Sequence, residues 1–258
     1  MSASYDLQPT NPLSGLHMVG MVLRRFLISY PVSPEVLRPF LPAGAECSLH
    51  DGAAWVSACV VRMEDVRPNI LPRLLGMGFH YLIHRTRARL PFPDGRMREA
   101  VLVLQPNIDS QLFSTFGSLL TGVAFQTREI EFQDNADGWR IRMQRRAEVL
   151  FDATIPKSGC GSMMPTGSRF SSVERADEFL LGVSFGGQWQ QGESVLKLLP
   201  ETHEPWVTSA GSCVTHCNRF LEHLDMESNV ADHALTMEGV PHYFGLRPIR
   251  SRLTMAGQ

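Results

Sequence analysis

The sequence predicts a mainly β (α+β) fold, in which antiparallel strands form a closed or nearly closed sheet with a few short helices outside it. Three observations support this prediction. Segments rich in β-branched residues are joined by turn sequences typical of hairpins. Only a few short segments have helical periodicity. The chain has no internal repeat and no long linker. We therefore expect one domain over residues 16–258, preceded by a disordered tail over residues 1–15.

The first half of the chain is predicted to consist mainly of hairpins. A strand is expected in LHMVGMVLRRFLISYPV, followed by a short helix in SPEVLRPFL that Ser33 caps. One hairpin is expected in ECSLHDGAAWVSACVV, because Asp51-Gly52 is the kind of dipeptide that a tight primed turn needs. A second hairpin is expected to join FHYLIHRTRARL to REAVLVLQ around Pro93-Asp94-Gly95.

The second half alternates between helices and strands. SQLFSTFGSLLTG predicts a helix that Ser110 caps and Gly122 ends. Strands are expected in FQTREIEF and WRIRMQRRAEVLF, on either side of the turn DNADG. In SSVERADEFLLG, Ser171 and Glu174 form a capping box and Gly182 ends the helix. Strands then follow in VSFGGQWQ and SVLKLL, a helix in CVTHCNRFLEHL, and a last strand in VPHYFGLRPIR.

Composition narrows the class of protein. The formal net charge is −2 without any block of like charges, so neither a nucleic-acid partner nor a membrane surface is expected. No apolar stretch approaches the ~20 residues that a membrane-spanning helix needs, and the N-terminal segment does not resemble a signal peptide. Five irregularly spaced cysteines fit reduced thiols. The expected location is cytoplasmic, and a homo-oligomer is left open.

Two short motifs suggest other functions. GVSFG, with Ser184 at its centre, matches the nucleophile elbow of serine hydrolases, but that motif needs a strand before it and a helix after it. A helix is predicted before it here, so Gly182 is better explained as a helix end. Cys213, His216 and Cys217, with His203 and His223 nearby, suggest a metal site. No C-x-x-C pair accompanies them, and an apolar helix face explains the cysteines better, so no metal and no cofactor is expected.

Several segments together resemble a known family. YPVSPEVLRPFLPAGAE, DGAAWVSACVVRMEDVRP, FHYLIHRTRA and NIDSQLFSTFGSLLTG are similar, in that order, to the YqjF-like family of unknown function, a branch of the acetoacetate decarboxylase-like superfamily. The similarity covers about residues 20–150, with looser matches in ERADEFLLG and VPHYFGLRP. It implies a cone-shaped antiparallel β-barrel whose interior holds a small-molecule pocket.

The resemblance also shows where this chain departs from true acetoacetate decarboxylases. Those enzymes carry adjacent lysines after the helix and its glycine. The first lysine forms a Schiff base with a 3-oxo acid, and the second lowers the pKa of the first. Counted from Gly122, the matching positions here are Phe125 and Gln126, and neither side chain can form an imine. The two lysines of this sequence, Lys157 and Lys197, lie elsewhere and are expected to be solvated surface residues.

A second departure concerns FHYLIHRTRA. Decarboxylases carry a glutamate at the position of Tyr81, whereas the following Arg85 and Thr86 are retained. Strand alternation places Tyr81, Ile83 and Arg85 on one face. With Phe125 or Gln126, these residues are predicted to line the pocket.

These residues suggest distinct chemical roles. Arg85 can hold a carboxylate or enolate, or it can form a structural ion pair with Glu129 or Glu131. Tyr81 can polarise a carbonyl or donate a proton, and His242 is a candidate general base.

Three functions fit these features. The first is an enzyme that polarises an oxo acid or a polyketide-like carbonyl compound in a lyase, hydratase or cyclase reaction, without imine chemistry. The second is a non-catalytic small-molecule binding protein with the same fold. The third is a serine hydrolase that uses Ser184.

Overall fold

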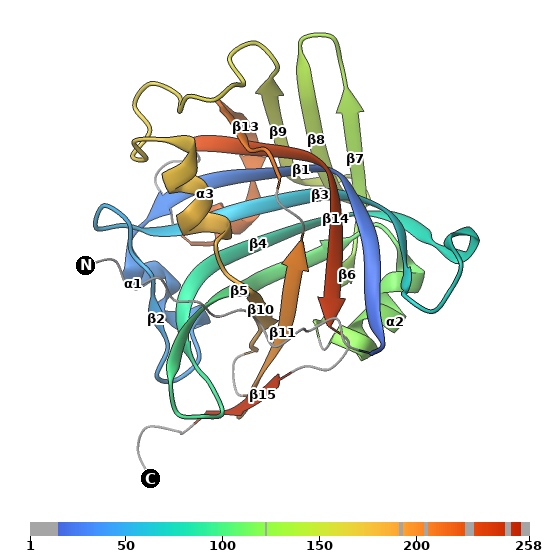
Figure 1. Cartoon of the computed structure of the whole chain (residues 1–258). Coiled ribbons are helices and arrows are strands. Elements are labelled where there is room, and N and C mark those ends of the chain that lie inside the picture. The colour runs from blue at the N-terminus through green and yellow to red at the C-terminus, as the bar shows by residue number, and fades with distance from the viewer. Residues whose placement is uncertain are drawn as a thin grey trace.

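The strand predicted after the N-terminal segment forms as β1 (His17–Val32), which belongs to the larger of two sheets (Figure 1). On one side β1 pairs with β14 (His233–Gly245), and on the other with β3 (Ala54–Pro68), both antiparallel. The computed structural model describes residues 15–121, 123–190, 193–203, 206–224, 230–245 and 249–253. The tail predicted over residues 1–15 and the helix end predicted at Gly122 thus lie, apart from residue 15, outside the described residues.

The larger sheet closes on itself as a ring of strands. From β3 the antiparallel pairing continues to β4 (Met77–Pro91) and β5 (Met97–Ile108). β5 then pairs in parallel with β10 (Phe185–Gln188), and β10 pairs antiparallel with β11 (Val195–His203). β11 pairs with β14, so the order β14-β1-β3-β4-β5-β10-β11 returns to its start.

The remaining elements surround this ring. A smaller sheet has the order β13 (Val214–Asn218), β9 (Glu148–Pro156), β8 (Gly138–Arg145) and β7 (Glu129–Asp134). Short strands extend the larger sheet: β2 (Glu46–Cys47), β6 (Gln126–Thr127), β12 (Ser209–Gly211) and β15 (Ile249–Arg252). The helices are α1 (Pro34–Leu37), α2 (Gln111–Thr121), α3 (Val173–Leu181) and α4 (Arg219–Glu222), with 3₁₀ turns at Arg38–Phe40 and Arg73–Leu75.

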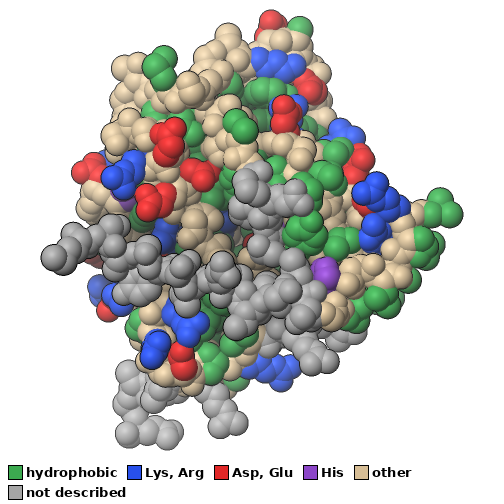
Figure 2. All heavy atoms as spheres, viewed as in Figure 1, with side chains coloured by type: hydrophobic (Ala, Val, Ile, Leu, Met, Phe, Trp, Pro, Cys, Tyr) green, Lys and Arg blue, Asp and Glu red, His purple; other side chains and the backbone are tan. Residues whose placement is uncertain are grey.

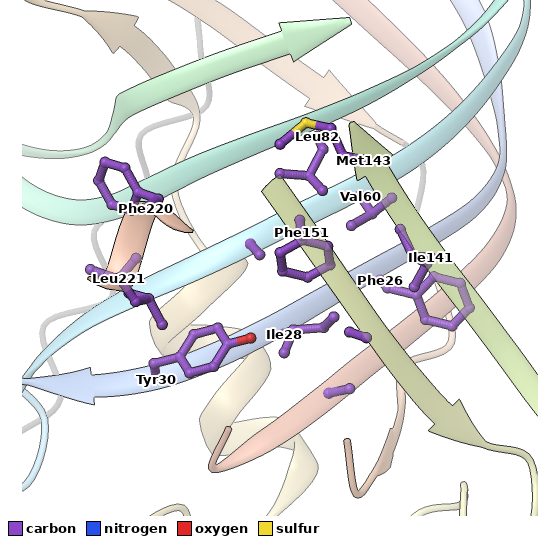
Figure 3. Packing of buried hydrophobic residues seen from close by; sticks show 14 of the residues in the cluster. Phe26, Ile28, Tyr30, Val60, Leu82, Ile141, Met143, Phe151, Phe220 and Leu221 are labelled. Atoms are coloured by element: carbon purple, nitrogen blue, oxygen red, sulfur yellow. The ribbon is translucent and has the colours of Figure 1, made fainter. Parts of the chain in front are cut away.

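The larger sheet is buried on both faces, and strand alternation decides which residues face which side. Phe26, Ile28 and Tyr30 of β1 point toward the smaller sheet, where Phe26 stacks on Phe132 with ring centroids 5.4 Å apart (Figure 3). Leu27, between them, belongs to a second apolar cluster inside the ring. Helix α3 packs on that inner cluster through Val173, Ala176, Leu180 and Leu181.

The predicted fold class is therefore confirmed: the protein is mainly β, largely antiparallel and closed, with few short helices. The β5–β10 and β5–β6 pairings are the parallel exceptions in the described part of the chain. Ser33 caps α1 and Ser110 caps α2 as predicted, each accepting a hydrogen bond from a backbone N–H. None of the described helices combines the length and hydrophobicity that crossing a membrane requires.

Four local predictions were wrong. The tight turn at Asp51-Gly52 forms, with positive φ at both residues, but it closes only a single bridge, because β2 pairs with β4. The strand predicted over WRIRMQRRAEVLF is interrupted by a turn at Arg146, where φ is 57°, and forms β8 and β9. Helix α3 is capped by Ser172, whose Oγ accepts from the N–H of Arg175, and not by Ser171.

The fourth error concerns CVTHCNRFLEHL, which was predicted to be one helix. Its first part forms β13, because it pairs with β9 in the smaller sheet. Helix α4 starts only at Arg219, where the side chain of Asn218 accepts a hydrogen bond from the N–H of Leu221. Cys217 is therefore a strand residue, whereas Phe220, Leu221 and Leu224 are buried in the core as expected.

The distribution of charge on the surface is mixed. On the face shown in Figure 2, acidic and basic side chains are interspersed and do not form one broad patch of either sign. Among the described residues, exposed ion pairs form within one strand or turn, such as Arg145–Glu148 and Arg62–Glu64. Exposed pairs of this kind stabilise the fold only weakly.

A buried histidine makes the stability of the fold depend on pH. His84 of β4 lies between the two sheets, where its Nε2 contacts Asn218 Oδ1 at 3.1 Å and its ring stacks on Phe220. Burial lowers the pKa of His84 to about 4. The unfolded chain binds a proton here near pH 6.5, so folding stability is lost as the pH falls from about 6.5 to 4.

We predict that His84→Gln, which cannot be protonated, reduces this loss. Urea unfolding at pH 7 and pH 4 should show that the wild-type protein loses more stability than the variant, by on the order of 3 kcal/mol. His216→Gln is the matched control, because His216 is exposed in the smaller sheet. Equal losses in the wild type and His84→Gln would contradict the prediction.

Candidate functional site

Charged side chains gather inside the ring, on the face that carries Leu27. Arg25 of β1 and Arg85 of β4 are each only 6% exposed. They interact electrostatically with each other, with Glu201 of β11 and with Tyr81 and Cys59. We call Arg25, Cys59, Tyr81, Arg85 and Glu201 the interior cluster.

Strand alternation explains why these side chains point inward. In β4, Leu82 belongs to the core between the sheets and His84 bonds to Asn218 there. Tyr81, Ile83 and Arg85 alternate with them and so face the inside of the ring, where Tyr81 and Ile83 contact the inner apolar cluster. The prediction that these three residues share one face is correct.

Arg25 is held by two contacts. Its Nε donates a hydrogen bond to Cys59 Sγ at 3.3 Å, and its guanidinium carbon lies 5.2 Å from the ring centroid of Trp206. Burial by itself would lower the pKa of Arg25, but Cys59, Tyr81 and Glu201 favour the charged form and together raise this pKa. Arg25 therefore stays protonated in the interior.

Arg85 is held by a helix end. Its Nη2 donates to the carbonyl oxygen of Leu180 in α3 at 2.9 Å. Burial lowers the pKa of Arg85 to about 10, while Cys59 and Glu201 act in the opposite direction. Within the described residues, no ion pair joins Arg85 to Glu129 or Glu131 of the smaller sheet.

Glu201 provides the negative charge of the cluster. Burial raises its pKa, and Arg25 and Arg85 oppose this shift. Its side chain nevertheless keeps 38% of its surface accessible, so solvent reaches this part of the interior. A Cβ on Gly186 would come within 2.8 Å of Glu201 Oε1, so the glycine leaves room for this carboxylate.

His242 lies beside Glu201 where the ring closes. Its Nε2 is 4.0 Å from Glu201 Oε2, and its ring packs against Phe244 at 4.4 Å. The side chain is almost fully buried, with 4% exposed. His242 therefore lies next to the interior cluster, to which Glu201 belongs.

Tyr81 remains a neutral hydrogen-bond donor. Burial raises its pKa, with a further contribution from Cys59, while Arg25 and Arg85 act in the opposite direction. The cluster as a whole then combines two guanidinium groups with one carboxyl group. Because an uncompensated buried charge is strongly disfavoured, this imbalance fits an additional anion inside the ring.

The two positions after α2 lie in different surroundings. Phe125 is half-buried and packs against the inner apolar cluster, with its ring 6.1 Å from that of Phe113. Gln126 is exposed, pairs with Asn107 in the β5–β6 ladder, and accepts a hydrogen bond from Arg128. The structure thus brings Phe125, but not Gln126, to the inner apolar cluster.

Arg25 and Glu201 were missed by sequence reasoning. Arg25 follows another arginine in LRRFL, and only alternation with the buried Phe26 distinguishes it from Arg24, which pairs outside with Glu238. Glu201 is a single acid at the end of an apolar strand, and its approach to Arg25 depends on ring closure. No local signal marks that approach.

The serine and the two lysines considered as nucleophiles each have different surroundings. Ser184 lies between α3 and β10, so a helix precedes it and a strand follows, the reverse of a nucleophile elbow. Lys157 Nζ contacts Asp134 at 2.6 Å on the surface. Lys197 lies four residues before Glu201 in β11 and therefore on the same strand face. Its Nζ is 3.9 Å from Glu193.

The cysteines and histidines weighed above as a metal site have other contacts where the structure describes them. Burial raises the pKa of Cys213 to about 12, and His216 Nε2 contacts Thr154 Oγ1 at 3.1 Å. His223 contacts the carbonyl of Arg219, and the side chain of His203 lies outside the described residues. Among the side chains that the structure describes, no group of three His, Cys, Asp or Glu residues is placed to hold a metal ion.

One family model matches most of the chain. The profile of DUF2071, described as "Uncharacterized conserved protein (COG2071)", matches residues 22–241, and the chain belongs to this family. A search of curated proteins finds no match.

Solved structures share the fold. The chain is similar to an acetoacetate decarboxylase from Legionella pneumophila, with a TM-score of 0.60 and 14% identity over 92% of this chain and 88% of that one. It is similar to an acetoacetate decarboxylase-like enzyme from Sphingomonas wittichii RW1, with a TM-score of 0.61 and 12% identity over 98% and 100% of the two chains.

A third similar structure contains a ligand. The enduracididine biosynthesis enzyme MppR, complexed with the condensation product of pyruvate and imidazole 4-carboxaldehyde, has a TM-score of 0.61 and 13% identity over 91% of this chain and 88% of that one. The three structures together show that this chain has the acetoacetate decarboxylase-like fold.

We predict that the purified protein carries no stoichiometric metal. Elemental analysis after purification without added metal should give well under one equivalent of zinc, because Cys213 and His216 already have other surroundings. One equivalent of zinc that Cys213→Ala removes would overturn this prediction.

Proposed function

We propose that this protein is an enzyme of the acetoacetate decarboxylase-like superfamily that acts on a small oxo acid or a polyketide-like carbonyl compound without forming an imine. The observation that carries the proposal is the interior cluster, in which two buried arginines face a single carboxylate. Within the superfamily, the segment similarities over about residues 20–150 favour the YqjF-like branch.

The charge of the cluster supports an anionic substrate. A planar guanidinium binds a carboxylate or an enolate through two parallel hydrogen bonds, and the interaction is strong in a site of low dielectric constant. The structure of MppR, a protein with a similar fold, has been solved in complex with pyruvate, a small oxo acid. Arg25 and Arg85 would hold the substrate acid group, with Ile83 and Phe125 contacting its apolar part.

The remaining residues supply proton chemistry. Tyr81, kept protonated by burial, would donate a hydrogen bond to the substrate carbonyl as negative charge develops on its oxygen. His242, beside Glu201, would act as the general base that removes a proton next to that carbonyl. Polarisation with proton transfer fits a lyase, hydratase or cyclase step.

A binding protein with the same fold is the second candidate. The specific observation in its favour is that both arginines are already held by protein groups, Arg25 by Cys59 and Arg85 by Leu180. Such a site can retain an anion without turning it over. The two candidates differ in whether the bound oxo acid is changed, which product analysis by mass spectrometry decides.

We predict that Arg25→Met weakens pyruvate binding by on the order of a hundredfold, since truncating one partner of a buried charge pair costs about 2–5 kcal/mol. Arg85→Met should have a similar effect. Arg24→Met is the matched control, because the neighbouring arginine pairs outside the ring with Glu238. Calorimetric titration with pyruvate measures the effect. If Arg24→Met and Arg25→Met bind pyruvate equally well, the proposed site is wrong.

We predict that no imine forms with a carbonyl substrate, because the resemblance assigns Phe125 and Gln126 to the positions of the catalytic lysines. Borohydride reduction in the presence of acetoacetate or pyruvate, followed by peptide mass spectrometry, should find no adduct. Lys197 is the residue to inspect, since alternation places it on the strand face of Glu201. An adduct there that Lys197→Met abolishes would show that the enzyme uses an imine after all.

A further inference from the structure

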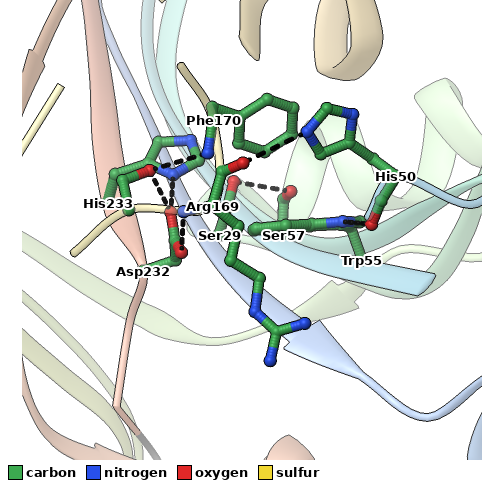
Figure 4. A network of polar contacts seen from close by, with 9 residues as sticks. Ser29, His50, Trp55, Ser57, Arg169, Phe170, Asp232 and His233 are labelled. Carbon is green, nitrogen blue, oxygen red and sulfur yellow. Dashed lines mark hydrogen bonds and ion pairs between the residues drawn. The ribbon is translucent and has the colours of Figure 1, made fainter. Parts of the chain in front are cut away.

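Helix α3 is fixed to the ring through the loop that precedes it. The carboxylate of Asp232 accepts hydrogen bonds from Ser168 Oγ at 2.6 Å and from the N–H of Arg169 at 2.9 Å, and it contacts His233 Nδ1 at 2.7 Å (Figure 4). The ring of Phe170 stacks on His50 with centroids 4.1 Å apart. The start of the helix is therefore anchored to β14 and to the segment before β3.

The end of α3 contacts β4. The carbonyl groups of its last turn carry the negative end of the helix dipole, and that of Glu178 also accepts a hydrogen bond from the N–H of Gly182. Arg85 donates to the carbonyl of Leu180 at 2.9 Å, and Arg87 donates to those of Glu178 and Phe179 at 2.9 and 2.6 Å. The orientation of Arg85 is thus set by α3.

The middle of the same helix reaches Arg25 through one intermediate residue. Asp177 Oδ1 accepts hydrogen bonds from Trp206 Nε1 at 3.3 Å and from Thr208 Oγ1 at 2.7 Å. The indole ring of Trp206 then covers the guanidinium of Arg25 at 5.2 Å. A tryptophan face is the preferred aromatic partner of a guanidinium.

The hydrogen bond that holds Arg25 does not use its terminal nitrogens. The guanidinium carbon lies over the indole ring of Trp206, and Nε donates to Cys59. The two terminal nitrogens, the atoms that bind a carboxylate in a parallel pair, take no part in the bond to Cys59. A guanidinium fixed in this way loses less conformational entropy when a ligand binds.

We infer that α3 positions both arginines of the interior cluster for an anionic ligand, and that Asp177 and Trp206 are positioning residues for Arg25. The inference rests on the proposed function, since it assumes that these arginines bind the substrate. It adds two residues that do not belong to the strands of the ring, Asp177 of α3 and Trp206 after β11, to the determinants of affinity.

Calorimetric titration with pyruvate tests the effect on binding. Trp206→Leu removes the ring over Arg25 and should weaken binding about fivefold. Trp206→Phe keeps an aromatic face but loses the Nε1–H that Asp177 accepts, so it should weaken binding by a smaller factor than Trp206→Leu. Asp177→Ala should behave like Trp206→Leu, and Asp177→Asn, which keeps an acceptor oxygen, like the wild type. Arg175→Gln is the control on the exposed side of the same helix, where Arg175 pairs with Glu178. Unchanged binding in Trp206→Leu and Asp177→Ala would overturn the inference.

A second measurement does not depend on the ligand. The Nε–Hε resonance of Arg25 in ¹⁵N-labelled protein, assigned by its loss in Arg25→Met, senses the ring current of Trp206. Asp177→Ala should move this resonance toward its position in Trp206→Leu, and Arg175→Gln should leave it in place. If Asp177→Ala leaves it unchanged, Asp177 does not hold Trp206 over Arg25. Failure of the wild type to bind pyruvate would count against the proposed function alone, because the resonance still decides the positioning role.

Discussion

The burial of two guanidinium groups beside one carboxylate is the constraint on which the rest of this structure depends. Charges inside a protein need partners, and Glu201 alone does not balance Arg25 and Arg85. The additional partners come from dipoles and an aromatic face: the carbonyl of Leu180 for Arg85 and the ring of Trp206 for Arg25. Helix α3, which supplies the Leu180 carbonyl, and β11, which supplies Glu201, therefore both contribute groups that stabilise the buried arginines.

The fold of this protein is shared with other proteins, but the shared fold does not define the chemistry of its interior. The ring and its inner apolar cluster are those of the acetoacetate decarboxylase-like fold, but a fold shared at low identity does not transfer a mechanism. In this chain Phe125 packs against the inner cluster and Gln126 is exposed. What the interior offers is positive charge and a protonated phenol. These groups can stabilise an enolate without a covalent bond to the protein.

Sequence reasoning succeeded where a signal is local. The β4–β5 hairpin, the caps of α1 and α2, and the shared face of Tyr81, Ile83 and Arg85 follow from turn residues, capping residues and a period of two. It failed where a strand pairs with a partner that lies far away in the sequence. The partner of β2 proved to be β4, and CVTHCN became β13 because β9 offered it a ladder that helical periodicity does not reveal.

The sequence by itself determined which residues share a strand face and that no lysine lies between α2 and β7, because both are properties of residue order. Only the tertiary structure decided that Arg25 and Glu201 meet. They lie on strands at opposite ends of the chain, and they approach because β11 pairs with β14 and β10 pairs with β5. Those pairings are set by burying the inner cluster as a whole. No short stretch of sequence encodes this long-range burial.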